Sequence, residues 1–150
     1  MPFSNLNNLI SRKQIKIQEA ITVPKVPQTF GEHMLKVRID RNLKRGTVAK
    51  EIGVTAIAIR AWELGKSVPE MPEMKKAIAF LGYYPFPKPL TLGEHLLRYR
   101  RLHGLSIKEL SELLEVNVGS ISLWERGMVT PVPDTMQKIE ELIYIKELSI

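Results

Sequence analysis

Cysteine is absent from this 150-residue chain, and histidine occurs only three times. Without cysteine there can be neither a disulfide nor a thiolate metal site, which suits a protein of the reducing cytosol. The histidines, His33, His95 and His103, are too few and too scattered to predict a zinc site. The sequence also lacks a Ser/His/Asp set, an H-E-x-x-H motif and a phosphate-cradling glycine loop. It therefore predicts a protein that is not an enzyme, with no catalytic residue, no metal and no cofactor.

Long apolar runs are missing as well. The longest fall far short of the roughly 18 residues that predict a membrane-spanning helix. The first residues, MPFSNLNNLISRK, lack the basic start and apolar core of a signal peptide. Hydrophobic residues make up 44% of the chain and charged residues 25%, a balance typical of globular proteins. We therefore expect a cytoplasmic protein without a membrane partner.

An internal repeat is the main feature that is present. The stretch IRAWELGKSVP at 59–69 returns as ISLWERGMVTP at 121–131, and TFGEHMLKVR at 29–38 returns as TLGEHLLRYR at 91–100. Each second stretch begins 62 positions after the first, so one register without gaps relates the two copies. The chain is predicted to be a tandem duplication, in which each copy is long enough to fold around a small core.

Positive charge is distributed unevenly over the formal net charge of +6. Residues 1–28 and the first copy carry the excess, whereas residues 91–150, with seven basic and nine acidic side chains, are net acidic. Basic surfaces bind polyanions because lysine and arginine replace the counterions of phosphates. Unless these charges are only a solvated surface, the first half of the chain is expected to bind a polyanion. The two copies then need not have the same function.

Helix signals fill both copies. Thr29 and Thr91 begin T-x-x-E capping boxes ahead of amphipathic runs, and no strand signal follows them. The pattern predicts an all-α protein of two units, each with four to five short helices, preceded by an extended N-terminal arm. The expected boundaries are an arm over 1–28, a first unit over 29–82 (repeat one), a Pro-rich linker over 83–90 and a second unit over 91–150 (repeat two).

Two short helices joined by a tight turn, after a longer helix, have the layout of a helix-turn-helix. LSIKELSELLEVNVGSISLWERG at 105–127 closely resembles the core of the Cro/repressor, or XRE-type, helix-turn-helix family. LKRGTVAKEIGVTAIAIRAWELG at 43–65 is a more divergent version. The resemblance covers about three-quarters of the chain and implies two lambda-repressor-like domains of bacterial type that bind double-stranded DNA. In such a domain the second helix of the motif enters the major groove, while nearby loops and helix N-termini hold the phosphates.

The resemblance implies which side chains would meet DNA. They lie at the start and on the outer face of the second motif helix, or are basic residues beside it: Lys44, Arg45, Thr55, Ala56, Ile57, Arg60 and Lys66 in repeat one, and Asn117, Val118, Gly119, Ser122 and Arg126 in repeat two. Of these, only Arg60 is a strong donor to base edges; Ser122 and Asn117 are weaker, and Val118 can contact a thymine methyl. The first motif helix of repeat two is rich in glutamate. Repeat one is therefore expected to be the better DNA binder.

In this family the arginine that ends the first helix commonly pairs with the glutamate after the aromatic position of the third. Arg38 with Glu63, and Arg100 with Glu125, match that pattern. The resemblance thus implies two structural ion pairs. The tryptophans just before these glutamates are expected in the core rather than stacked on bases.

Residues 1–28 lie outside the resemblance, and their interpretation stays open. QIKIQEAITV at 14–23 alternates partly, as a short strand does, so the arm could pair with that of a second copy and form a homodimer. It could also be a partly ordered tail, or a basic tail that reaches DNA through Arg12, Lys13, Lys16 and Lys25.

Two functions are compatible with the sequence. The first is a sequence-specific DNA-binding transcriptional regulator, whose two helix-turn-helix units read in cis across a semi-rigid linker. The second is a degenerate helix-turn-helix scaffold that binds protein, for example through repeat two, or associates with itself through the helix-turn-helix surfaces. A continuous basic rim around Arg60 and Ser122 favours the first; an apolar patch flanked by carboxylates favours the second.

Overall fold

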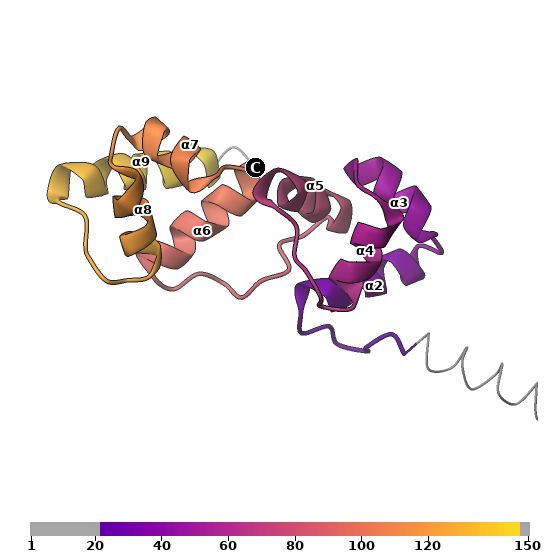
Figure 1. The fold of residues 1–150 in the computed structure, drawn as a ribbon. Helices are drawn as coiled ribbons and strands as arrows, with labels where there is room; N and C mark the ends of the chain where they lie inside the picture. The colour runs from indigo at the N-terminus through magenta and orange to yellow at the C-terminus, as the bar shows by residue number, and fades with distance from the viewer. Residues whose placement is uncertain (1–21, 148–150) are drawn as a thin grey trace, which may run out of the picture.

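The computed structural model describes residues 22–147, with side chains to residue 144. Over this range the chain forms eight helices and no strand (Figure 1). Repeat one contains α2 (Phe30–Asp40), α3 (Arg45–Ile52), α4 (Ala56–Glu63) and α5 (Met71–Leu81). Repeat two contains α6 (Leu92–His103), α7 (Ile107–Leu114), α8 (Val118–Glu125) and α9 (Pro133–Glu147). The predicted all-α fold of two units is confirmed, and each unit has four of the four to five helices expected. Most of the possible strand at 14–23 lies outside the described residues, as do Arg12, Lys13 and Lys16.

The capping boxes fix where the first helix of each repeat begins. Thr91 Oγ1 accepts a hydrogen bond from the Glu94 N–H at 3.2 Å, and the Glu94 carboxylate accepts from the Thr91 N–H at 3.0 Å. Thr29 and Glu32 form the same pair at the start of α2. In the last helix, α9 begins at Pro133 and Asp134 lies inside its first turn.

These capping boxes make the stability of the protein depend on pH, with lower stability in acid. The Glu94 carboxylate also accepts from the Leu90 N–H at 2.7 Å, and this bond, followed by that from Thr91, lowers the pKa of Glu94 below its usual value. Since the pKa is lower in the folded chain, the stabilisation is complete above the unfolded pKa, about 4.3, and is lost as pH falls through the folded pKa. We expect Glu94→Gln to lower the melting temperature at pH 7. The melting temperature of this variant should also fall less steeply as the pH drops below 5.

Glu51→Gln is the matched control for this prediction, because Glu51 is exposed on α3 and belongs to no capping box. Melting curves followed by circular dichroism across pH check the result. Identical pH profiles for Glu94→Gln and the unsubstituted chain would contradict it.

Each repeat has its own core. In repeat one, Met34, Val48, Ile52 and Ile59 are fully buried around Trp62, whose side chain is 3% exposed. In repeat two the central residues are Leu96, Leu110, Ile121, Ile139 and Trp124. Both tryptophans are thus core residues.

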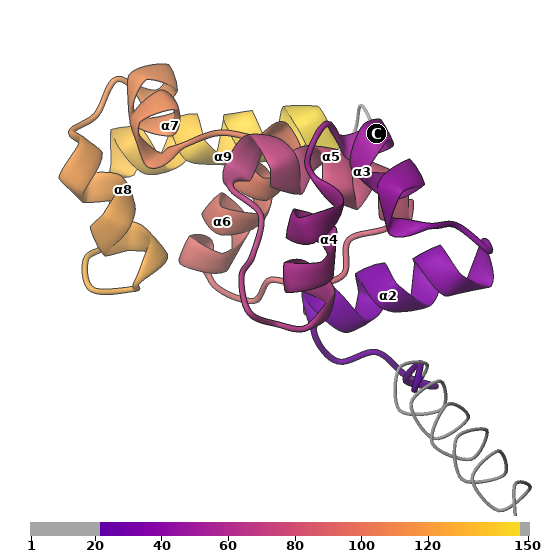
Figure 2. The ribbon, with the colours of Figure 1, turned by 45° about the vertical axis from the view of Figure 1, so that its right-hand side comes forward.

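The two repeats pack directly against each other, the end of the first against the start of the second. The last helix of repeat one, α5, lies beside the first helix of repeat two, α6 (Figures 1 and 2). Leu102 of α6 packs against the core of repeat one. The linker is packed as well: the Arg101 guanidinium of α6 lies 3.8 Å from the centroid of the Phe86 ring and donates to the Tyr84 hydroxyl at 3.2 Å. These contacts fix the orientation of one repeat relative to the other.

Candidate nucleic-acid interface

The second motif helices start at polar caps. Thr55 Oγ1 accepts from the Ala58 N–H at 3.1 Å at the start of α4, and Asn117 Oδ1 accepts from the Gly119 N–H at 2.8 Å at the start of α8. The turn before each helix uses the left-handed region, at Gly53 with φ 85° and at Glu115 with φ 57°. In both repeats the helix-turn-helix therefore exposes the first turn of its second helix.

Repeat one presents a basic surface around α4. Arg60 and Lys66 are exposed, and no described residue forms a hydrogen bond or ion pair with the Arg60 side chain. Lys44, at the N-terminus of α3, is exposed too. Thr55, Ala56 and Ile57 complete the surface, with Ile57 81% exposed. The predicted side chains of repeat one, apart from Arg45, thus lie exposed at α4 and its flanks.

Arg45 is occupied within the fold. Its Nε donates to Glu63 Oε2 at 2.7 Å, while 38% of its side chain stays exposed. A contact between Arg45 and a phosphate remains a prediction. Such a phosphate would share the guanidinium with Glu63.

Glu63 is the centre of a buried charge cluster that positions α4. Its side chain is 2% exposed and accepts from Arg38 of α2 through both carboxylate oxygens, with 3.1 Å between Arg38 Nη2 and Oε2. Arg38 Nη1 also donates to the Leu43 carbonyl at 3.1 Å. The cluster thereby ties α2, the loop before α3, and the end of α4 together.

Repeat two repeats this arrangement with one arginine fewer. Arg100 donates to Glu125 at 2.6 and 2.8 Å, and to the Leu105 carbonyl at 3.2 Å. Ile107 stands where repeat one has Arg45. The sequence did not predict Arg45 as a partner of Glu63; a basic first residue in α3 was the available signal.

The surface around α8 differs from that around α4. Asn117, Val118, Gly119 and Arg126 are exposed, Ser122 is half-buried, and Arg126 Nε donates to the Ser122 carbonyl at 3.1 Å. Large apolar side chains are exposed nearby, namely Leu113, Val118, Met128, Val129 and Val132. The glutamates of α7 and the turn after it, Glu109, Glu112 and Glu115, are exposed as well. Repeat two thus combines apolar side chains with carboxylates, whereas around α4 the exposed apolar side chains Ile57, Leu64 and Val68 accompany Arg60 and Lys66.

Two glycines set how closely the helices approach, and sequence reasoning missed this role. A Cβ on Gly31 would stand 2.0 Å from the carbonyl oxygen of Trp62, and one on Gly93 would stand 2.5 Å from that of Glu125. The first helix of each repeat therefore contacts the end of the second motif helix directly. The signal was a glycine at the same place in both copies of the T-x-G-E capping box.

Neither a membrane-spanning helix nor a metal site is found in the part of the chain that the structure describes. None of its helices has the length and apolar character needed to cross a bilayer. Within residues 22–147, no three histidine, aspartate or glutamate side chains are grouped so that they could hold a metal ion.

Comparison with known proteins identifies the motif. A helix-turn-helix family model matches the chain twice, at residues 34–87 and 96–143. No curated protein and no solved structure matches the chain. One match falls on each repeat, the first extending into the linker, and together they cover more than half of the chain. The chain therefore belongs to the XRE-type helix-turn-helix family as a tandem duplication.

Proposed function

We propose that this protein is a sequence-specific DNA-binding regulator in which repeat one is the principal reading head. The carrying observation is the exposed first turn and outer face of α4, where Arg60 stands unpaired among the described residues. An arginine there can donate two hydrogen bonds to a guanine edge in the major groove. Lys44, at the start of α3, and Lys66, after α4, are exposed and can contact phosphates.

Repeat two would either make weaker contacts to bases or only hold the phosphate backbone. Ser122, Asn117 and the helix start at Val118 can contact a base or a thymine methyl, and Arg126 can contact a phosphate. Because the α5–α6 contact and the packed linker set the orientation of repeat two, binding by repeat one would place α8 in one defined position.

The second candidate is protein binding by repeat two. It is favoured by the exposed apolar side chains around α8 and the carboxylates of α7, which would repel phosphates. In this case repeat one would bind DNA alone, and repeat two would recruit a protein partner.

Selection from a randomised duplex pool, followed by fluorescence anisotropy on the selected site, tests the proposal. We expect Arg60→Ala to relax the preference at one base position, with a loss of about 1–3 kcal/mol on the selected site. Lys44→Ala should weaken all sequences alike and reduce the salt slope by about one. Ser122→Ala measures whether repeat two reads a base.

Lys36→Ala, which removes the same charge from the outer part of α2, is the matched control. It should leave the base preference unchanged. If selection yields no site, or Arg60→Ala and Lys36→Ala behave alike, α4 is not a reading helix and the proposal of DNA reading by repeat one is wrong.

A further inference from the structure

The duplication allows the same groove to be compared in two copies. In repeat one the groove between α2 and α5 is covered by the segment that follows α5. Phe86 stacks on Phe30, with the ring centroids 6.0 Å apart and the planes at 8°. The Tyr83 hydroxyl lies 2.8 Å from His33 Nδ1, and Pro85 between these aromatic residues is buried. An aromatic segment containing proline is therefore the natural cover of this groove.

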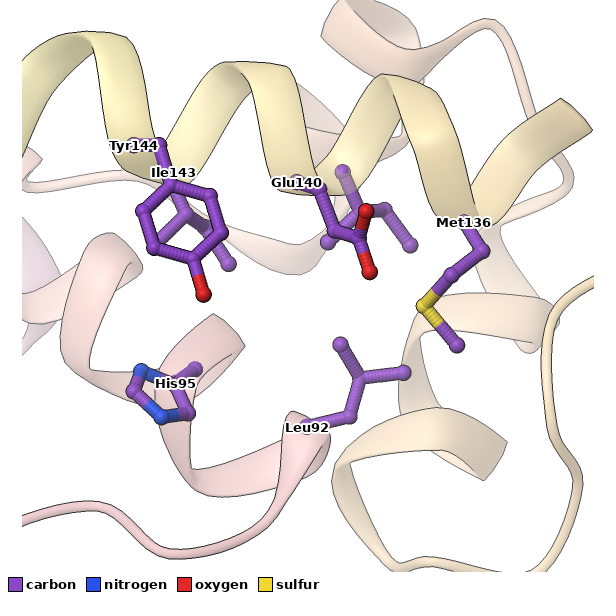
Figure 3. A pocket seen from close by; sticks show the side chains of 7 residues that line it. Leu92, His95, Met136, Glu140, Ile143 and Tyr144 are labelled. Carbon is purple, nitrogen blue, oxygen red and sulfur yellow. The ribbon is translucent and has the colours of Figure 1, made fainter. Parts of the chain in front are cut away.

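In repeat two the corresponding groove, between α6 and α9, is open (Figure 3). It is a hollow of about 210 Å³, and its walls include Leu92 and His95, the counterparts of Phe30 and His33. An apolar cavity of roughly 150 Å³ already accommodates a benzene ring, so an aromatic side chain fits. No described segment covers the groove as Tyr83 and Phe86 cover that of repeat one. Figure 3 shows Tyr144 above His95, and Tyr144 remains 64% exposed.

A buried polar atom in this groove lacks a partner. His95 Nδ1 is inaccessible to solvent and forms no hydrogen bond with the described residues, whereas the same atom of His33 faces the Tyr83 hydroxyl. A buried nitrogen without a hydrogen bond costs free energy, which an incoming chain with polar groups can recover. Among the described residues, the groove thus has neither the ring nor the polar contact that repeat one has.

We propose that the α6–α9 groove binds the N-terminal arm of a second copy of this chain, with the Phe3 ring inserted in the hollow. Pro-Phe occurs only at 2–3 and 85–86 in the sequence, and the second occurrence is the cover of the equivalent groove. Phe3 is also the only aromatic residue before Phe30.

Charge favours the same pairing. Residues 1–28 carry four basic side chains and one acidic, whereas repeat two is net acidic. Glu140 lies on the wall of the groove and is exposed, so it can face the basic arm. The attraction would be lost if this carboxylate were replaced by a positive charge.

A second copy is the proposed source of the arm, because the described start of the chain leads away from the groove. In both views residues 22–28 lead away from α9, which belongs to the other end of the molecule (Figures 1 and 2). Two copies that exchange arms would each fill the groove of the other and close a symmetric dimer.

Sedimentation velocity of the full chain over a range of concentrations tests the proposal. We expect a monomer–dimer equilibrium whose dissociation constant rises by about tenfold or more in Phe3→Ala, which removes the buried ring, and rises similarly in Glu140→Lys. Glu141→Lys is the matched control, because Glu141 is the adjacent exposed carboxylate and does not line the groove. It should leave the dissociation constant unchanged.

Mixing the two variants separates exchange from binding of each arm within its own chain. A dimer of Phe3→Ala with Glu140→Lys retains one intact contact, formed by the unsubstituted arm in the unsubstituted groove. The other contact carries both substitutions. The first of them already removes most of the binding energy of that contact, so the second costs little more. The mixture should therefore dimerise more tightly than either variant alone. A monomer at every concentration, a dimer that is indifferent to both substitutions, or no recovery on mixing would each overturn the proposal.

Discussion

Replacing Glu63 with alanine is expected to lower the free energy of unfolding by about 3–5 kcal/mol. Arg38 is 7% exposed, and its guanidinium depends on the Glu63 carboxylate and one carbonyl for its hydrogen bonds. Without the carboxylate, a buried positive charge remains uncompensated, and Arg45 beside it adds repulsion. A loss of this size is a large part of the stability of a small domain.

Urea unfolding followed by circular dichroism measures this effect, and two further variants identify its cause. Arg45→Ala should cost about 1 kcal/mol or less, because its side chain is 38% exposed and Arg38 still satisfies Glu63. The double variant Arg38→Met/Glu63→Leu should regain most of the loss, since it removes both buried charges and fills the space with apolar atoms. If the double variant is as unstable as Glu63→Ala, the stranded charge is not the cause.

The same cluster shows how far the sequence predicts this fold. One register of 62 positions, two T-x-x-E boxes and the spacing of apolar residues were enough to predict two all-α units, because these signals are local in the chain. The family resemblance supplied the pairing of Arg38 with Glu63, which their separation of 25 positions in the sequence would otherwise hide. It gave no reason to expect Arg45 as a third member, because side-chain pairing between neighbouring helices depends on their crossing in space.

Features that depend on the packing of one repeat against the other were beyond the sequence. A Pro-rich stretch predicted a semi-rigid linker, yet it does not show that Phe86 lies between Phe30 and Arg101. Likewise, the repeat aligned His33 with His95, but only the structure shows that His33 faces Tyr83 and that His95 Nδ1 has no partner among the described residues. The DNA-binding residues stay a prediction, because their exposure is a requirement for contact and not a proof of it.

Replacing Gly31 with alanine is expected to cost about 3 kcal/mol, although it adds a single methyl group and favours the helix in isolation. The new Cβ would stand 2.0 Å from the Trp62 carbonyl oxygen and 3.0 Å from its carbon, both backbone atoms. A flexible side chain could move away at little cost, but relief here requires α2 and α4 to separate. That separation would also stretch the contact between Arg38 and Glu63 and open the core around Trp62. Gly93→Ala should act alike in repeat two, where the Cβ would stand 2.5 Å from the Glu125 carbonyl oxygen.

Gly46→Ala is the matched control for this prediction. Gly46 lies in α3, and a Cβ added there meets nothing within 4 Å. The same chemical change should therefore stabilise repeat one by about 0.5–1 kcal/mol, because alanine loses less backbone entropy in a helix than glycine does. Thermal and urea unfolding should then show changes of opposite sign in the free energy of unfolding of the two variants. The difference between these changes gives the cost of the close approach of α2 to α4 at Gly31. Equal effects at both positions would mean that α2 and α4 are not in direct contact at Gly31.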